Sequence, residues 1–342
     1  MVRRKKSIWS RSLQRSLNAL TRSAINVGSK AVKQALRSTP VVKKIASSNS
    51  AALAAGKMSM GIAVGATGGR RYWLYQPAAL QHDESLPLLV MLHGCGQDAK
   101  ELAACSRMNR LAARERFIVL YVEQDRLANM QGCWNWYETR SGLAQAEAAI
   151  IDKAIDQVCL LHAVDATRIA VAGLSAGASM AALLATRHPE RFRAVVMHSG
   201  VAPGMAHSSV TALRAMRGRE KVITPLDPFP PGTRLPALLV IQGSADGVVA
   251  PSNGAIAARR WAALCGTTAV TSRVLQRGAR YPATITDYRV GKQLVATQYQ
   301  ISGLGHAWSG GAKGRAYSDP HGPDASRIIW AFVSRQFASV GE

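Results

Sequence analysis

Ser175 stands where two different sequence patterns meet. The apolar run 168–172 precedes it, the alanine-rich run 176–187 follows it, and Gly173 and Gly177 flank it in Gly-Leu-Ser-Ala-Gly. We interpret the first run as a strand and the second as a helix. Gly-x-Ser-x-Gly in this context is a sharp turn that lifts the serine hydroxyl above a sheet, next to a helix N-terminus that stabilises negative charge. Ser175 is therefore the predicted nucleophile of an acyl transfer; the alternative is an ordinary turn with a capping serine.

A serine nucleophile needs a histidine base and an acid that orients this base, in the chain order serine, acid, histidine. Asp246 lies in a turn directly after the buried apolar run 237–241, and it is the predicted acid. A turn or helix-cap role is its alternative, and Asp287, inside a strand-like stretch, is the second candidate. Two histidines follow Asp246. His306, in a glycine-rich loop after a strand, is the predicted base, whereas His321 precedes the last helix.

Acyl transfer also needs two N–H donors for the developing oxyanion. The residue after the nucleophile, Ala176, is expected to supply one. The other is expected from Cys95 in His93-Gly-Cys-Gly-Gln97, which follows an earlier apolar run. Cys95 would act through its main-chain N–H; the alternative, a thiol nucleophile, competes with Ser175 for the same role.

Continuous apolar runs alternate with helix-length segments from residue 70 onward. The runs that we interpret as strands are 71–75, 86–92, 117–122, 168–172, 194–197, 237–241 and 295–301; the helical segments are 101–114, 143–161, 176–187 and 255–265. This alternation predicts an α/β fold, a mostly parallel sheet with helices on both faces. Functional sites in such sheets lie beyond the carboxyl ends of the strands, where the runs before Ser175, Asp246 and His306 end.

Charge divides the chain into unequal parts. The first 82 residues hold 15 Lys and Arg and no acidic residue, so most of the net charge of +23 lies there. Residues 1–45 have a basic amphipathic pattern that suits either an anionic surface or a solvated tail, and their composition also resembles a transit peptide. Residues 46–69, rich in small residues, are predicted to be a linker, and residues 70–342 the catalytic domain. Because the basic excess is confined to one end, nucleic acid is not the expected partner of the fold.

Several classes of protein are disfavoured by composition. The chain of 342 residues is 48% hydrophobic and 18% charged, so it can bury a sizeable core. The five cysteines form no pattern with zinc spacing, and we expect neither a metal nor an organic cofactor. No stretch has the length and apolarity of a membrane-spanning helix, and no apolar segment of a secretory signal follows the basic start. A cytoplasmic location is the expectation.

Six motifs in one order resemble the poly(3-hydroxybutyrate) depolymerase family of esterases, which have the α/β-hydrolase fold. They are His93-Gly-Cys-Gly-Gln97, Cys133-Trp-Asn-Trp136, Gly173-Leu-Ser-Ala-Gly177, Gly243-Ser-Ala-Asp246, Gly305-His-Ala-Trp-Ser-Gly-Gly311 and Asp319-Pro-His-Gly-Pro-Asp-Ala-Ser326. The resemblance covers residues 70 to 340. It implies a triad of Ser175, Asp246 and His306 that hydrolyses short-chain polyester or its oligomers, with feruloyl and acetylxylan esters as the alternative substrates.

The resemblance has further implications. It implies that the Cys95 and Cys133 loops approach each other, which suggests a disulfide. Trp134, Trp136 and Trp308 would line an apolar cleft for substrate; the alternative is that some of them belong to the core. Many members of the family are secreted, whereas this chain has the basic segment, which motivates the hypothesis that residues 1–45 rest on a granule or another anionic surface.

A second hypothesis comes from another class of protein. The charge of +23 would also suit a non-catalytic protein that binds an anionic surface or nucleic acid on a hydrolase fold. The confinement of the charge to one end, and a complete set of triad residues in the expected order, favour the enzyme.

Overall fold

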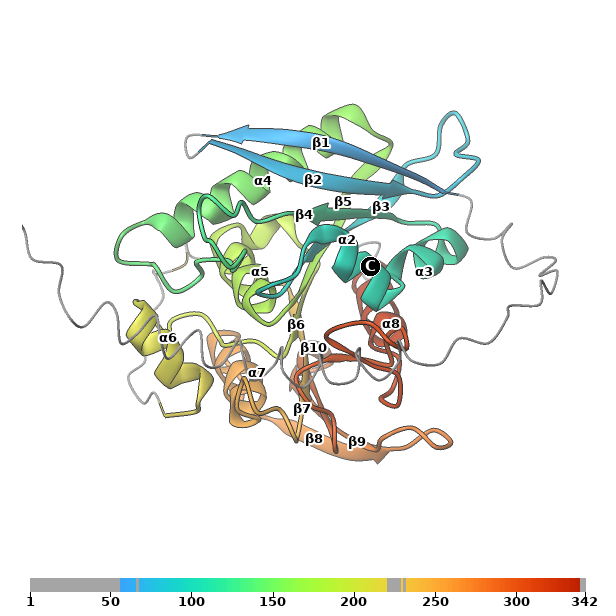
Figure 1. Ribbon diagram of the computed structural model, residues 1–342. Helices are drawn as coiled ribbons and strands as arrows, with labels where there is room; N and C mark the ends of the chain where they lie inside the picture. Colours follow the sequence, from blue (N-terminus) through green and yellow to red (C-terminus); the bar gives the residue numbers. More distant parts are fainter. Residues whose placement is uncertain (1–55, 66–67, 220–228, 230–231, 339–342) are drawn as a thin grey trace, which may run out of the picture. The chain divides into compact units, whose positions relative to one another are not determined.

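The computed structural model describes residues 56–65, 68–219, 229 and 232–338. The predicted basic segment, residues 1–45, lies outside these residues, as does the first part of the predicted linker. The described residues form a large sheet with helices packed against it (Figure 1).

The strands are β1 (Lys57–Gly65), β2 (Gly68–Gln76), β3 (Leu86–Leu92), β4 (Ile118–Val122), β5 (Val164–Leu174), β6 (Ala194–His198), β7 (Ala237–Gly243), β8 (Val270–Leu275), β9 (Ala283–Val290), β10 (Gln293–Ile301), β11 (Trp308–Ser309) and β12 (Ser318–Asp319). The helices are α2 (Ala99–Ser106), α3 (Met108–Glu115), α4 (Leu143–Leu161), α5 (Ala176–Arg187), α6 (Ser209–Met216), α7 (Ser252–Leu264) and α8 (Ala325–Ala338), with a 3₁₀ turn, η2 (Pro189–Arg191).

The large sheet has the strand order β1-β2-β4-β3-β5-β6-β7-β10-β9-β8. The central strands, from β4 to β10, are all parallel, and an antiparallel hairpin extends the sheet at each edge. The prediction of a mostly parallel α/β sheet is confirmed.

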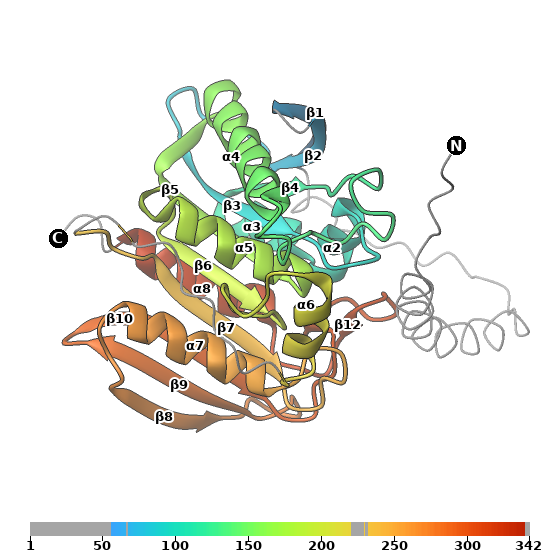
Figure 2. The same ribbon diagram turned by 90° about the vertical axis from the view of Figure 1, so that its left-hand side faces the viewer.

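Helices cover the sheet on both faces (Figure 2). One hydrophobic cluster packs the sheet against α4, α5 and α7, and another packs it against α2, α3 and α8. Strand β3 contributes side chains to both clusters, because alternate side chains of a strand point to opposite faces. Leu88 and Val90 belong to the first cluster, and Leu89 and Met91 belong to the second. Burial on both sides explains why the central strands are continuous apolar runs.

The linker prediction is wrong for residues 57–65, 68 and 69. Residues 57–65 form β1, which pairs antiparallel with β2. The small residues that suggested a linker make room for packing: a Cβ on Gly61 would lie 2.2 Å from the ring of Tyr72. In the second half of β1 every second side chain, namely Met60, Ile62 and Val64, is exposed, and this period of two is the strand signal that the composition obscured.

The segment 101–114, predicted as one helix, is two helices. Arg107 lies between α2 and α3 with a φ of 55°, in the left-handed region, and its N–H donates to the carbonyl of Ala103. The guanidinium of Arg107 reaches the carbonyl of Gly310, in the segment that follows β11. This tertiary contact accompanies a break that the sequence pattern does not indicate.

Candidate functional site

The predicted nucleophile lies on a strained turn. Ser175 connects β5 to α5 with a φ of 57° and a ψ of −119°, a conformation that residues with a side chain seldom adopt. A Cβ on Gly173 would lie 2.2 Å from the carbonyl of Gly177, and one on Gly177 would lie 2.2 Å from the carbonyl oxygen of Leu92. Both flanking glycines are therefore required by close backbone contacts, as expected for a turn that raises a hydroxyl above the sheet.

Three side chains from separate parts of the chain meet at this turn. Nε2 of His306 lies 2.9 Å from Oγ of Ser175, and Nδ1 lies 2.9 Å from Oδ2 of Asp246. Asp246 follows β7 and His306 follows β10, and these strands are parallel neighbours, so their loops emerge at the same edge of the sheet. A Cβ on Gly243 would lie 2.1 Å from the carbonyl oxygen of Leu304, which shows how closely the two loops pack. The structure thus brings the three predicted triad residues into hydrogen-bonding order.

Asp246 is held as a carboxylate by donors on both oxygens. Oδ1 accepts the main-chain N–H groups of Val248 (2.9 Å) and Val249 (2.8 Å), and Oδ2 accepts from Gln242 (3.1 Å) as well as from His306. Burial by itself raises the pKa of this carboxyl, but the hydrogen bond and charge of His306, with the two N–H groups, hold the pKa below its ordinary value. An ionised, fixed Asp246 can orient His306 and stabilise its protonated form.

The alternative acid and the alternative base lie away from Ser175, and each of them interacts with other residues. Asp287, on β9, accepts a hydrogen bond from Thr297 at 2.7 Å and pairs with Arg273. His321 lies beside the ring of Tyr281, with 6.2 Å between the ring centroids. Neither residue shares a hydrogen bond with Ser175, Asp246 or His306 among those of the described residues.

The two predicted oxyanion donors lie beside Ser175. Ala176 is the first residue of α5, where main-chain N–H groups have no acceptor within the helix. The Cys95 loop reaches the nucleophile through its neighbour, because a Cβ on Gly94 would lie 3.4 Å from Cβ of Ser175. On either side of Cys95 the N–H groups are engaged: that of Gly94 donates to Gln97 Oε1 (3.1 Å) and that of Gly96 to the carbonyl of Gln131 (2.9 Å). The role of Cys95 and Ala176 as donors stays a prediction that this arrangement permits.

Cys95 is also covalently linked. A disulfide joins it to Cys133, 38 residues later, and this is the pairing that the family resemblance implied. Its thiol is therefore not available as a nucleophile. The three other cysteines, Cys105, Cys159 and Cys265, are free thiols.

Sequence reasoning missed a buried histidine next to the triad. His198, the last residue of β6, is fully buried, and this burial lowers its pKa to about 3. Its Nε2 accepts the N–H of Ser309 at 3.2 Å, so the single proton of the neutral ring lies on Nδ1, which donates to Ser199 Oγ at 3.2 Å. Its ring stacks on Trp308, with 5.2 Å between centroids. A polar residue at the end of an otherwise apolar strand is the signal that could have identified it.

Gln242 and Glu147 were missed as well. Gln242, fully buried in β7, donates from Nε2 to Asp246 and to the carbonyl of Val249. Glu147, fully buried in α4, accepts hydrogen bonds from the segment that carries Cys133. Gln242 is a lone polar residue in a buried apolar strand, and Glu147 is a polar residue on the buried face of α4; buried polar groups of this kind indicate a hydrogen-bond network.

The prediction that three tryptophans line a substrate cleft needs correction. Trp134 and Trp308 have exposed fractions of 0% and 1%, so neither side chain faces an open cleft. Trp308 donates from Nε1 to Ser326 and stacks on His198, and Trp134 lies against the ring of His93. Trp136 is 8% exposed and packs edge-on against Tyr137. The indole rings belong mainly to the core because their large apolar area is removed from water there.

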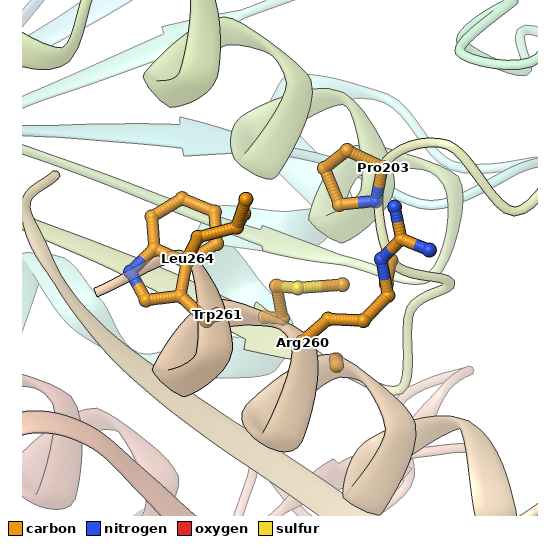
Figure 3. A pocket seen from close by; sticks show the side chains of 7 residues that line it. Pro203, Arg260, Trp261 and Leu264 are labelled. Atoms are coloured by element: carbon orange, nitrogen blue, oxygen red, sulfur yellow. The ribbon is translucent and has the colours of Figure 1, made fainter. Parts of the chain in front are cut away.

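The described residues include hollows of different size. A cavity between α7 and the segment after β6 measures about 10 Å³ and lies among Pro203, Arg260, Trp261 and Leu264, enough for roughly one water (Figure 3). An open groove of about 440 Å³ runs beside the Cys95 and Cys133 loops. It is lined by Ile62, Gly69, Arg71, Gln97, Asp98, Glu123, Gln124, Asp125, Arg126 and Gly132.

Side chains that ligate metals do not gather in groups of three or more anywhere in the described residues. Nor does any described helix combine the length and the apolar character that crossing a membrane requires.

Comparison with known proteins agrees with this geometry. Residues 70–280 match the protein family described as Esterase PHB depolymerase, a range that includes Ser175 and Asp246 and ends before His306. Poly(3-hydroxyalkanoate) depolymerase C of Paucimonas lemoignei is 31% identical over 231 residues, which are 64% of this chain and 54% of the relative. The chain thus spans about half the length of that relative.

Feruloyl esterase B of Neurospora crassa is 27% identical over 250 residues, which are 69% of this chain and 82% of the relative. The structure is similar to that of an acetyl xylan esterase from Aspergillus awamori, with a TM-score of 0.58, 21% identity, and coverage of 72% of this chain and 94% of that one. At this identity the likeness concerns the fold. The chain therefore belongs to the Esterase PHB depolymerase family, and it is an esterase of the α/β-hydrolase fold.

Proposed function

We propose that this esterase is a serine hydrolase that cleaves poly(3-hydroxybutyrate) or its short-chain oligomers through an acyl-enzyme. The observation that carries the serine mechanism is the position of His306, with 2.9 Å from Nε2 to the Ser175 hydroxyl and 2.9 Å from Nδ1 to the Asp246 carboxylate. This arrangement lets one histidine accept the serine proton while the other ring nitrogen is held by a carboxylate.

The reaction proceeds in two steps. Oγ of Ser175 attacks the ester carbonyl carbon as its proton passes to Nε2 of His306, and the N–H groups of Cys95 and Ala176 bind the oxyanion. The ester C–O bond then breaks, and His306 returns the proton to the leaving alcohol. Water, deprotonated by His306, attacks the acyl-enzyme, and the carboxylic acid is released with regeneration of Ser175.

The serine mechanism is tested with p-nitrophenyl butyrate. We expect measurable hydrolysis by the wild type and a loss of at least about a thousandfold in kcat for Ser175→Ala. Equal measurable rates for the two proteins would end the serine mechanism. Absence of hydrolysis by the wild type would favour the alternative from another class, a non-catalytic protein that binds an anionic surface.

Two observations support different ester substrates. The family match and the depolymerase of Paucimonas lemoignei favour the polyester. The second candidate, a feruloyl or acetylxylan ester, is supported by the relative from Neurospora crassa, of which a larger share is matched. The measurement is kcat/KM on hydroxybutyrate oligomers, methyl ferulate and acetylated xylan. The polyester proposal requires the highest value on the oligomers, and a higher value on either other substrate selects the second candidate.

The proposed place of action is inside the cell, with residues 1–45 resting on a polyester granule or another anionic surface. Its support is the basic amphipathic pattern of that segment. We expect the full-length chain to sediment with isolated granules and a chain lacking residues 1–45 to remain in the supernatant. Equal sedimentation of both proteins would refute this proposal without affecting the proposed reaction.

A further inference from the structure

Glu147 is a fully buried carboxylate that the proposed reaction does not use. It lies near the start of α4, on the face that packs into the core with Ala144, Ala148 and Ile151. Burying a carboxylate is costly unless donors satisfy it, so the donors that surround Glu147 indicate what this residue does.

Those donors belong to the segment between β4 and α4. Oε1 of Glu147 accepts from Gln124 Nε2 at 2.7 Å and from Asn135 Nδ2 at 2.6 Å, and Oε2 accepts the main-chain N–H of Asn135 at 2.8 Å. The guanidinium of Arg70 lies 3.9 Å from Oε1. Gln124 and Asn135 stand at the two ends of segment 124–135, so one carboxylate clamps both ends of this segment to α4.

The clamped segment is connected to the Cys95 loop in several ways. Gln124 Nε2 donates to the carbonyl of Cys133 at 3.0 Å, and Cys133 is joined to Cys95 by the disulfide. The carbonyl of Gln131 accepts the N–H of Gly96 at 2.9 Å. Cys95 and its neighbour are therefore both tied to a segment whose ends are fixed by Glu147.

We propose that Glu147 is a positioning residue for the oxyanion hole: by clamping segment 124–135 it sets, through the Cys133–Cys95 disulfide, the place of the Cys95 N–H that faces the oxyanion of the Ser175 reaction. This inference rests on the proposed serine mechanism. Because an oxyanion donor acts only when it lies at hydrogen-bond distance from the transition-state oxygen, a small displacement of this N–H lowers kcat and leaves substrate binding nearly unchanged.

The test variant is Glu147→Gln, which keeps the shape of the side chain but turns an NH₂ group toward a donor. We expect kcat for p-nitrophenyl butyrate to fall by about tenfold and KM to stay within about twofold of the wild type. The Ki of a trifluoromethyl ketone, which forms a tetrahedral adduct with Ser175, should rise by the same factor as kcat falls. Active sites are counted by titration with an organophosphate, so that unfolded protein does not contribute to the comparison.

Glu190→Gln is the matched control, because Glu190 is an exposed carboxylate in η2; its kcat, KM and Ki should equal those of the wild type. The route through the disulfide is tested with Cys133→Ser. If both residues act on the same N–H, the double variant should lose little more than the more affected single variant. The proposal would be overturned if the factors by which the two single variants lower kcat multiplied in the double variant, or if KM rose while kcat stayed unchanged.

Asn135→Ser provides a second test if Glu147→Gln does not fold. It removes the side-chain bond of 2.6 Å and keeps the main-chain bond of 2.8 Å to Glu147. We expect the same kinetic pattern with a smaller fall in kcat, and unchanged kcat and Ki would refute the proposal. Inactivity of the wild type, or full activity of Ser175→Ala, would instead contradict the proposed function itself.

Discussion

The main-chain carbonyl of His198 accepts the N–H of Ser175 at 2.8 Å. This bond holds the turn of Ser175 against the end of β6. The ring of the same histidine accepts the N–H of Ser309, three residues after His306. One buried residue therefore contacts both the turn of Ser175 and the segment that follows His306, although neither contact involves an atom that reacts in the proposed mechanism.

The hydrogen bond between Asp246 and His306 gives the first prediction. In Asp246→Asn the ring of His306 can no longer donate from Nδ1 to a carboxylate, so kcat should fall by roughly 10³- to 10⁴-fold with little change in KM. Asp287→Asn is the matched control, since Asp287 pairs with Arg273 and Thr297 away from the triad. Steady-state kinetics on p-nitrophenyl butyrate measures kcat and KM of both variants. A larger fall in kcat for Asp287→Asn than for Asp246→Asn would assign the acid role to Asp287.

The glycines around Ser175 give a prediction about stability. Gly173→Ala would place a Cβ 2.2 Å from the main chain of Gly177, which cannot move without breaking the start of α5. We expect a loss of about 3 kcal/mol or more in the free energy of unfolding. Gly247→Ala, where a Cβ meets no atom within 4 Å, should change it by less than about 0.5 kcal/mol. Urea unfolding followed by circular dichroism measures both, and similar values for the two variants would contradict the packing argument.

The buried ring of His198 predicts an acid-dependent loss of stability. Burial lowers its pKa in the folded state to about 3, whereas in the unfolded chain it is about 6.5. Between these values the unfolded state binds a proton that the folded state does not, so stability is intact above the unfolded pKa and falls as the pH decreases toward the folded one. Each such group contributes up to about 1.4 kcal/mol per pH unit.

His198→Gln isolates this contribution, since glutamine keeps an acceptor for the N–H of Ser309 and does not titrate. We expect the free energy of unfolding of this variant to depend less steeply on pH between 6 and 4 than that of the wild type. The other buried histidine, His93, has a pKa that burial lowers too, so part of the dependence remains in the variant. Identical slopes for the two proteins would show that His198 is not a source of acid sensitivity.

The disulfide between Cys95 and Cys133 gives a further prediction. It closes a loop of 38 residues, so its removal should lower the free energy of unfolding by about 3 to 4 kcal/mol. Cys133→Ser carries out this change, and Cys159→Ser, at a free and partly buried thiol, is the control with an expected effect below about 1 kcal/mol. Thermal unfolding with and without dithiothreitol should show a reductant effect on the wild type and on Cys159→Ser but not on Cys133→Ser, and no effect on the wild type would contradict the pairing.

Much of the site could be predicted because its signals are local. Glycines at two fixed positions indicate the turn of the predicted nucleophile, and the predicted acid and base each follow an apolar run that ends in a turn. Since parallel strands present their carboxyl ends at one edge of the sheet, the order of these segments was enough to propose that Ser175, Asp246 and His306 meet. The continuous apolar runs likewise predicted the sheet, because strands covered on both faces have no polar alternation.

What remained undetermined by the sequence depends on contacts between distant segments. The sequence does not distinguish an exposed tryptophan from a buried one, and only the tertiary packing showed that Trp134 and Trp308 lie in the core. The small residues of β1 resemble a linker until Tyr72 occupies the space above Gly61. Glu147 and His198 are single polar residues in apolar stretches, and their partners lie 12 and 111 residues away along the chain.

The sequence by itself therefore determined the fold class and the three residues that the fold brings within hydrogen-bond distance, because periodicity and turn chemistry act over a few neighbouring residues. The tertiary structure alone decided how the residues around Ser175 are held. Hydrogen bonds to His198 and Glu147 form only when separate strands, loops and helices pack together, since a buried polar group must find its partner wherever the chain has placed it.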